Sequence, residues 1–407
     1  MYSIKYLILC LLGGILLAAQ LQAADWSFSP RLAITGEASA GIFHHLEGAG
    51  RRHIAVSNHQ IAVTWEDNSS QDPQIYLSLK QKTGEGFGPA IRVSSGQEAY
   101  EPALAALSDD RFIVVYEQDG AVFARLLTGQ GLSKVLKLSN NRAGQASIAT
   151  YQDQAVVVWR EQFQRRYALK VARLSVDKAG RLRLEESDQV EPDWLDTPLL
   201  KPTITMNAST LCVAWEDRRA GHTRLLVSSS DRVDVAFSSP VSLNEFYSNR
   251  NEYDKGNGVT RVSMAGFAED EIVASWMDKR VGGKGYGIYA ALGFNGGKDF
   301  GPNEKVHSKK GDELPHYNPA VAGNTEGDFL IAWDDFRNGD SDIWLSHYNE
   351  EGEWSTDFSP PPASGPGEQT HVSIALDQDG IVHLLWIERS GSNAPSQLWY
   401  SASTMNQ

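Results

Sequence analysis

The chain has 407 residues, of which 41% are hydrophobic, and it contains 36 Gly and 11 Trp with almost no helical periodicity. A chain of this size can bury a large all-β core, and no linker divides it, so we expect one closed domain over residues 24–407. The formal net charge of −14 argues against nucleic acid and anionic membranes as main partners.

The N-terminus, residues 1–23, is typical of a secretory signal peptide. Lys5 precedes an apolar stretch from Tyr6 to Ala19, and small residues follow at the end of the segment. Cys10 follows the bulky Leu9 and does not fit a lipoprotein cleavage site. We therefore expect the segment to be removed from a secreted or periplasmic protein with no membrane insertion. Cys212 then remains as a small core residue that forms no disulfide within the chain.

A repeat runs through the rest of the chain. Seven similar stretches each end an apolar run with an aromatic residue, and these residues lie 43 to 61 positions apart. They are Trp65, Tyr116, Trp159, Trp215, Trp276, Trp333 and Trp386. A period near 50 that is made of short strands predicts the blades of a β-propeller.

Each repeat contains four strand signals. In the second repeat these are residues 103–107, 111–117, 121–127 and 134–139, and turns rich in Ser, Asp and Gly separate them. The first segment is small and apolar, as the crowded strand next to a propeller axis should be. The sequence therefore predicts four-stranded antiparallel blades.

The two ends of the chain complement each other. The last repeat stops after its third strand, residues 397–403, whereas residues 26–34 carry the aromatic, Ser, Pro and apolar order of the other fourth strands. We expect residues 26–34 to be the outer strand of the last blade, so that no edge remains unpaired. The prediction is an all-β, seven-bladed propeller closed by its N-terminal strand.

The segment "GFNGGKDFGPNEKV" from Gly293 resembles the Asp-box of sialidase-type propellers. Gly293 replaces the Ser of that pattern, Asn295 its Asp and Phe300 its Trp, while Gly297 is kept. Weaker copies occur at residues 82–89 and 349–354. The resemblance extends over essentially the whole mature chain and implies a propeller fold in which these turns point away from the active face.

The stretch "IAWDDFRNGDSDIWLS", residues 331–346, contains an acidic corner that recurs in other repeats. A recurring set indicates a hydrogen-bonded turn in which an Asp accepts backbone N–H groups and an Arg braces it. The corners should ring the face on which propellers bind ligands, so Asp217, Arg218, Asp335 and Arg337 stay in the candidate ligand-binding set. A calcium ion held by Asp335, Asp340 and Asp342 with Asn338 is an alternative. No other metal or cofactor is expected.

Long insertions that break the repeat are the better candidates for a ligand site. They span residues 36–53, 187–200, 244–258 and 307–318. Their aromatic and polar side chains suit a sugar, which stacks on aromatic faces and accepts hydrogen bonds at its hydroxyls. We expect the site at the axial mouth between blades four and six. The candidate residues from these insertions are Trp194, Asp196, Tyr247, Arg250, Tyr253, His316 and Tyr317.

Two classes of function follow. The first is a monomeric binding module for glycans or protein partners. The second is an exo-acting glycoside hydrolase of sialidase type. For it the resemblance implies three Arg that clamp a carboxylate, a Tyr nucleophile activated by a Glu, and an Asp that acts as acid/base catalyst. The family's Arg-Ile-Pro motif is absent, and Arg31 is its nearest equivalent. No phosphate loop, zinc-ligand set or Ser nucleophile elbow is present, and His44, His45, His53 and His59 are spaced too irregularly for a metal site. The sequence assigns no catalytic residue and favours the binding module.

Overall fold

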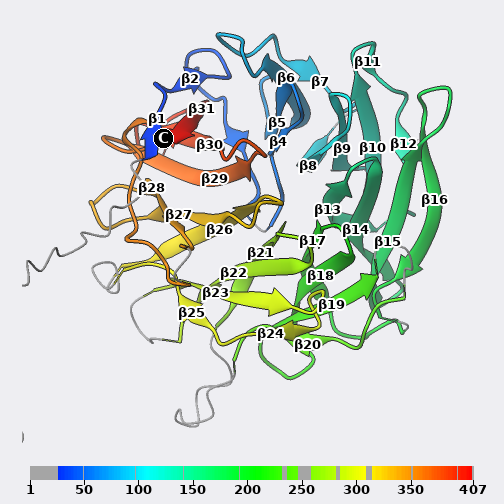
Figure 1. The fold of residues 1–407 in the computed structure, drawn as a ribbon. Coiled ribbons are helices and arrows are strands. Elements are labelled where there is room, and N and C mark those ends of the chain that lie inside the picture. The colour runs from blue at the N-terminus through cyan, green and yellow to red at the C-terminus, as the bar shows by residue number, and fades with distance from the viewer. Residues whose placement is uncertain are drawn as a thin grey trace, which may run out of the picture.

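The computed structural model describes residues 26–405 except 49, 97, 141, 192, 232–235, 246–257, 281–284, 309–313, 350–351 and 392. The described chain is all-β and forms a seven-bladed β-propeller, as predicted (Figure 1). Its described residues include one short 3-10 helix, Pro361–Ala363, and no α-helix. No helix in this part of the chain is long and apolar enough to cross a membrane.

In each blade three antiparallel strands follow one another outward from the axis, and they are long except for the interrupted innermost strand of blade 1. The innermost strands are β3 (His44–His45) with β4 (Ile54–Val56), β8 (Ala99–Leu107), β13 (Ala143–Tyr151), β17 (Leu199–Met206), β21 (Thr260–Phe267), β26 (His316–Gly323) and β29 (Glu368–Leu376). The second strands are β5 (Gln60–Asp67), β9 (Arg111–Gln118), β14 (Gln154–Phe163), β18 (Thr210–Asp217), β22 (Glu271–Asp278), β27 (Phe329–Asp335) and β30 (Val382–Arg389). The third strands are β6 (Gln74–Gln81), β10 (Ala121–Thr128), β15 (Arg166–Val176), β19 (Arg224–Asp231), β23 (Gly287–Phe294), β28 (Asp342–His347) and β31 (Ser396–Met405).

The outer strands are short in most blades. They are β7 (Ile91–Arg92), β11 (Gly131–Leu132) with β12 (Leu136–Lys137), β16 (Leu182–Gln189), β20 (Val241–Ser242), and β24 (Asp299–Phe300) with β25 (Glu304–Lys305). In blade 6 the described residues contribute only two isolated bridges, Leu345 to Phe358 and Tyr348 to Trp354. Short outer strands leave little exposed edge for pairing with another chain.

The N-terminal segment completes the last blade, which confirms the predicted closure. β1 (Trp26–Phe28) and β2 (Leu32–Ala33) both pair antiparallel with β31. Figure 1 shows the blue first strand beside the red last one. Trp26 and Leu32 also pack against the two neighbouring apolar clusters. The ring is therefore sealed by strand pairing between the two ends of the chain.

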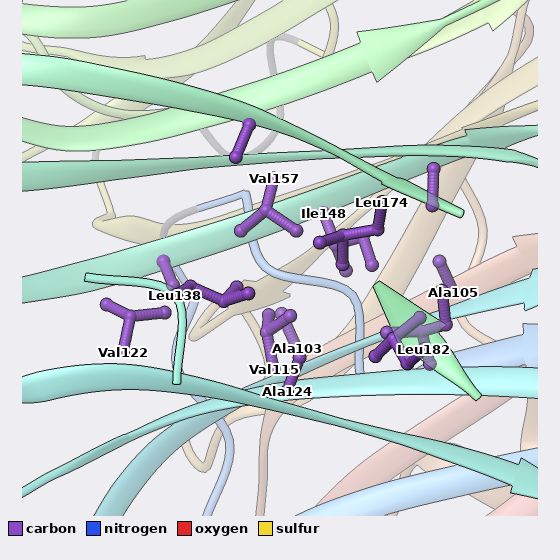
Figure 2. Packing of buried hydrophobic residues seen from close by; sticks show 14 of the residues in the cluster. Ala103, Ala105, Val115, Val122, Ala124, Leu138, Ile148, Val157, Leu174 and Leu182 are labelled. Carbon is purple, nitrogen blue, oxygen red and sulfur yellow. The ribbon is translucent and has the colours of Figure 1, made fainter. Parts of the chain in front are cut away.

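Neighbouring blades pack through apolar faces. Between blades 2 and 3, Val115 and Leu138 meet Ile148 and Val157 in one buried cluster (Figure 2). The aromatic residues that end the second strands are almost fully buried, as expected for core residues: Trp215, Trp276, Trp333 and Trp386 have no exposed surface. Burial of such large apolar surfaces is the main stabilising contribution to the ring.

The two ends of the ring differ. We call the end that carries the connections between blades and the loops between second and third strands the loop face, and the opposite end the turn face. On the loop-face side, six innermost strands contain a bulge, and the bulged residue of each has a positive φ. These residues are Glu101, Gln145, Lys201, Arg261, Asn318 and His371. The bulge therefore recurs in six of the seven blades, whereas the residue at the bulged position differs from blade to blade.

Candidate functional site

The acidic corner of the sequence is part of the blade architecture. In blade 6, Asp335 accepts hydrogen bonds from Trp333 Nε1 at 2.9 Å and from the Arg337 amide at 2.9 Å. Arg337 Nε lies 3.0 Å from the same carboxylate. Blade 5 repeats the arrangement with Asp278 and Arg280. The carboxylate two positions after the aromatic is thus directed into its own blade.

The acid one position after the aromatic is directed toward the next blade. The bulged residue of that blade donates its backbone N–H to it: Glu101 to Glu66 at 3.0 Å, Arg261 to Glu216 at 2.9 Å and His371 to Asp334 at 2.9 Å. Gln145 donates to Glu117 in the same way. Because side chains alternate along a strand, adjacent acids of one corner take opposite roles.

Blade 1 departs from this plan. Its innermost strand is interrupted between β3 and β4 by residues 46–53, which we call the axial insertion. The insertion reaches the innermost strands of all six other blades. Its contacts are Leu104 N to Arg52 O (2.8 Å), Arg51 Nε to Ala146 O (2.9 Å), Thr203 Oγ1 to Gly50 O (3.0 Å), Arg52 Nη2 to Met264 O (3.1 Å), His53 N to Ser373 Oγ (3.0 Å), and close packing of Gly48 on Asn318. The insertion therefore occupies the axis of the propeller.

On the loop-face side of the insertion lies a group of charged residues that we call the axial cluster. Its members are Glu47, Arg51, Glu101, Glu117, Lys201, Glu216 and Arg261. Glu101, Lys201 and Arg261 each keep 28% of their side-chain surface exposed. The cluster is therefore mostly buried but keeps some surface in contact with solvent.

Ion pairs across the axis hold the cluster together. Arg51 Nη2 lies 2.7 Å from Glu101 and 3.9 Å from Glu117, which are both in blade 2. Arg261 of blade 5 lies 3.0 Å from Glu47 of the axial insertion. Lys201 Nζ lies 3.4 Å from Glu216. The first three pairs connect the axial insertion of blade 1 with blades 2 and 5, whereas the pair of Lys201 with Glu216 lies within blade 4.

The carboxyls of the cluster differ in their pKa. Burial raises the pKa of Glu117 to about 8, and the negative charge of Glu101 adds to the effect. Burial alone would also raise the pKa of Glu47, but the nearby His45 and the charges of Arg51 and Arg261 outweigh it and hold the pKa well below its usual range. The pKa values of these two carboxyls are therefore shifted in opposite directions from the ordinary Glu value.

Three histidines surround the cluster. Burial lowers the pKa of His53 to about 3 and that of His371 to about 4. Burial alone would also lower the pKa of His45, but the neighbouring carboxylates of Glu47, Glu66 and Glu101 raise it. His45 is therefore the histidine that can carry charge beside Glu47 near neutral pH.

The predicted corner residues do not join this cluster. Asp217 is buried and bonded by Trp215 and by the amide and Nε of Arg219. Arg219 is therefore the brace, whereas Arg218 is exposed. Asp335 is fully buried, and Arg337 also contacts Asp357 at 2.7 Å. The structure thus places these four residues in or beside the repeated turns rather than at the axis.

The predicted insertion residues are dispersed. His316 is fully buried, with Nε2 3.1 Å from Asp335, and its ring stacks on His307. Tyr317 packs edge-on against Tyr286 and Phe336. Trp194 and Asp196 lie over the third strand of blade 3, where Trp194 meets Phe163 and Asp196 lies 3.4 Å from Arg166. Tyr247, Arg250 and Tyr253 fall outside the described residues.

The calcium alternative and the Asp-box resemblance can both be located. The described residues contain no group of three or more His, Cys, Asp or Glu side chains that could hold a metal ion. Asp342 accepts from Asn338 at 2.7 Å and from the Gly365 amide at 2.9 Å. Residues 293–300 form the turn between β23 and β24 on the turn face, where Asn295 contacts Asp299 at 3.3 Å.

Sequence reasoning overlooked most of the axial cluster. Glu117 stands one position after Tyr116, just as Glu66 and Glu216 follow their Trp residues, so this offset was a usable signal. Glu101 and Lys201 each precede the Pro that opens a predicted innermost strand. Glu47 and Arg51 lie in an insertion that the sequence does identify, but nothing in its residues predicts that it crosses the axis.

Comparisons with known proteins concern the fold. No family model matches the sequence, and no curated protein matches it significantly. A protein of unknown function from Dyadobacter fermentans aligns with a TM-score of 0.54 at 13% identity, over 94% of this chain and 99% of its own. A variant of the α-L-arabinofuranosidase Arb93A from Fusarium graminearum, in complex with an iminosugar inhibitor, aligns with a TM-score of 0.50 at 12% identity, over 93% and 98% of the two chains. An α-L-arabinanase from Penicillium chrysogenum aligns with a TM-score of 0.49 at 10% identity, over 92% and 98%. Proteins that share this propeller fold thus include glycoside hydrolases.

Proposed function

We propose that this chain is a secreted or periplasmic, carbohydrate-active propeller that hydrolyses a glycosidic bond at the axial cluster. The observation that carries the proposal is that two carboxyls near Arg51 have pKa values shifted in opposite directions. Glu117 has its pKa raised to about 8, whereas the pKa of Glu47 is held below its usual range. Glycoside hydrolysis needs a protonated carboxyl for the leaving oxygen and an ionised carboxylate for the anomeric carbon or its attacking water.

In this proposal each residue of the cluster has a defined role. Glu117 is the general acid, and Glu47 is the ionised carboxylate. Arg261 and His45 keep Glu47 ionised through the ion pair at 3.0 Å and the contact at 3.8 Å. Lys201 and Glu101 remain partly exposed and are available to hydrogen-bond sugar hydroxyls.

The nature of the substrate is proposed more coarsely. The Fusarium protein with this fold is an α-L-arabinofuranosidase, so arabinofuranosides are a first choice of substrate. A sialidase reaction needs arginines that are free to clamp a carboxylate. Arg51 and Arg261 are instead paired with Glu101 and Glu47, which makes a neutral sugar the better fit.

A binding module without hydrolysis is the second candidate. The observation that favours it is the engagement of Glu216, which accepts hydrogen bonds from Thr260 and the Arg261 amide and lies 3.4 Å from Lys201. A carboxylate used in this way serves recognition or structure rather than chemistry. A glycan, or a protein partner, would then bind the same mouth to a monomeric propeller.

The test combines hydrolysis and binding. The purified protein is assayed against aryl glycosides that include an α-L-arabinofuranoside and a sialoside, and is applied to a glycan array. Glu117→Gln should lower kcat by about 100-fold or more while ligand binding persists. Glu185→Gln, on the exposed outer strand of blade 3, is the matched control. Glycan binding without turnover of any glycoside would favour the second candidate.

A further inference from the structure

A second site lies on the turn face, on the opposite side of the axial insertion from the axial cluster. A cavity of about 710 Å³ opens there among the innermost strands of five blades. Its lining combines polar residues with apolar ones that keep some exposed surface, among them Val56, Ala106, Ala375 and Leu376. A volume of this size is within the range of pockets that hold small organic ligands.

The axial insertion contributes one residue to the lining of this cavity and is tightly packed at the axis. Gly50 is packed so tightly against blades 4 and 5 that a Cβ there would lie 2.5 Å from Thr203 Oγ1 and 2.6 Å from Val262 O. Arg52 is the residue of the insertion that lines the cavity. Two neighbouring residues of the insertion therefore lie at different places: Arg52 at the cavity and Arg51 in the axial cluster.

Arg52 differs from the neighbouring Arg51. Arg51 pairs with Glu101, whereas no described carboxylate lies within ion-pair distance of Arg52. Its guanidinium donates to Met264 O at 3.1 Å, which uses one of its five N–H groups. Burial lowers the pKa of Arg52, with no carboxylate to oppose it. Arg52 is half-buried, and a cation partly removed from water without a counter-ion is costly, so an anion that reached it would be stabilised.

The rim of the cavity is already neutralised in part. Lys82 Nζ lies 2.8 Å from Asp377 and 3.5 Å from Asp379. Asp377 also lies 3.3 Å from His383. Lys82 thus has two carboxylate partners of its own, which leaves Arg52 as the cation of the cavity that lacks one among the described residues.

We propose that this cavity binds an aliphatic carboxylate, with the carboxylate on the Arg52 guanidinium and the alkyl chain along the apolar residues of the lining. The guanidinium presents parallel N–H groups that match the two carboxylate oxygens, and the apolar residues remove the chain from water. The site is distinct from the proposed glycoside hydrolase site and does not depend on it.

Calorimetric titration of the full-length mature protein at neutral pH tests the proposal with hexanoate, heptanoate and octanoate as probes. We expect saturable binding at one site, with Kd tightening by about fourfold for each added methylene, the equivalent of about 0.8 kcal/mol. Arg52→Gln should weaken octanoate binding at least tenfold and change binding of octan-1-ol less than twofold. Arg111→Gln, an ion-paired residue on the same face, is the control and should leave both unchanged.

A second variant keeps the proposal testable if Arg52→Gln does not fold. Ala375 lines the cavity and is only partly buried, so Ala375→Phe should fill the space and abolish binding of both octanoate and octan-1-ol. Octanoate binding that survives Ala375→Phe, or no saturable binding by the unmodified protein, would overturn the proposal. If Lys82→Gln loses octanoate binding and Arg52→Gln keeps it, the anion lies at the rim, and the assignment to Arg52 is overturned.

Discussion

Trp333 Nε1 donates a hydrogen bond to Asp335 Oδ2 over 2.9 Å, and four other blades repeat this relationship. The equivalent pairs are Trp65 with Asp67, Trp159 with Glu161, Trp215 with Asp217, and Trp276 with Asp278. In blade 7 the indole N–H of Trp386 has no acceptor among the residues that the structure describes. The bond ties the buried aromatic of the second strand to the loop that follows it, so the corner stabilises the blade.

Replacement of Asp335 by Ala should therefore affect folding before binding. The change leaves Arg337 and Trp333 without their shared acceptor inside the protein. We expect the free energy of unfolding to fall by about 3 to 5 kcal/mol in urea titrations. Arg218→Ala, at an exposed position of the equivalent corner, should change it by about 0.5 kcal/mol or less. Unchanged stability with abolished ligand binding would instead make Asp335 a binding residue.

Acid should destabilise the propeller through its buried, paired carboxyls. Burial alone would raise the pKa of both Asp335 and Asp377. Interactions with His316 and Arg337 lower the pKa of Asp335 instead. Interactions with His383 and Lys82 lower that of Asp377. A carboxyl with a lowered folded pKa stabilises the protein above its unfolded pKa, and this contribution disappears as pH falls through the folded value. We expect the urea midpoint to decline below about pH 4. Asp377→Asn should show a shallower decline, and an equal slope would contradict the assignment.

Removal of the N-terminal strand should open the ring. A chain that lacks residues 24–35 loses the pairing of β1 and β2 with β31 and exposes the edge of blade 7. We expect a marked fall in Tm by circular dichroism relative to a chain that begins at Asp25. Equal melting temperatures would mean that this seam does not close the ring.

Sequence periodicity was sufficient for the fold because each blade repeats the same local pattern. The regular spacing of residues such as Trp65, Trp215 and Trp333 indicates repeated blades. The residue types along 26–34 match those of the other outer strands and so predict an outer strand there. These signals are local, so a single sequence contains them. The match between the two chain ends then follows from the requirement that no edge stays unpaired.

The axial cluster was harder to predict because its contacts are not local. Arg261 and Glu47 are 214 positions apart in the chain. Their meeting depends on the packing of Gly48 on Asn318 and of Gly50 on Thr203, which no repeat encodes. The expected site between blades four and six was instead based on insertion length, and part of that region falls outside the described residues.

Gly50 should be the most sensitive position of the axial insertion. Its φ of +69° favours Gly, and the space for a Cβ is already filled by Thr203 and Val262. Gly50→Ala should lower the free energy of unfolding by about 2 to 4 kcal/mol, from strain and overpacking together. Gly221 has a φ of +81° with nothing within 4 Å, so Gly221→Ala should cost only about 1 kcal/mol. Equal losses in urea titrations would show that the insertion is not tightly packed at the axis.

The protonation of Glu117 can be tested without knowing the substrate. Its folded pKa is raised to about 8, so the folded protein holds a proton there that the unfolded chain loses near the ordinary Glu pKa. The folded state then binds more protons than the unfolded state between these two values, and stability must fall as pH rises from about 4.3 toward about 8. Glu117→Gln stays neutral throughout, so its urea midpoint should decline less than that of the unmodified protein between pH 5 and 9, which is the range of the measurement.

Hydrolysis by the unmodified protein should decline over the alkaline end of the same range, because a general acid that has lost its proton cannot protonate the leaving oxygen. Identical pH slopes in the two proteins would show that Glu117 is ionised at neutral pH, and the general acid would then have to be sought elsewhere in the axial cluster.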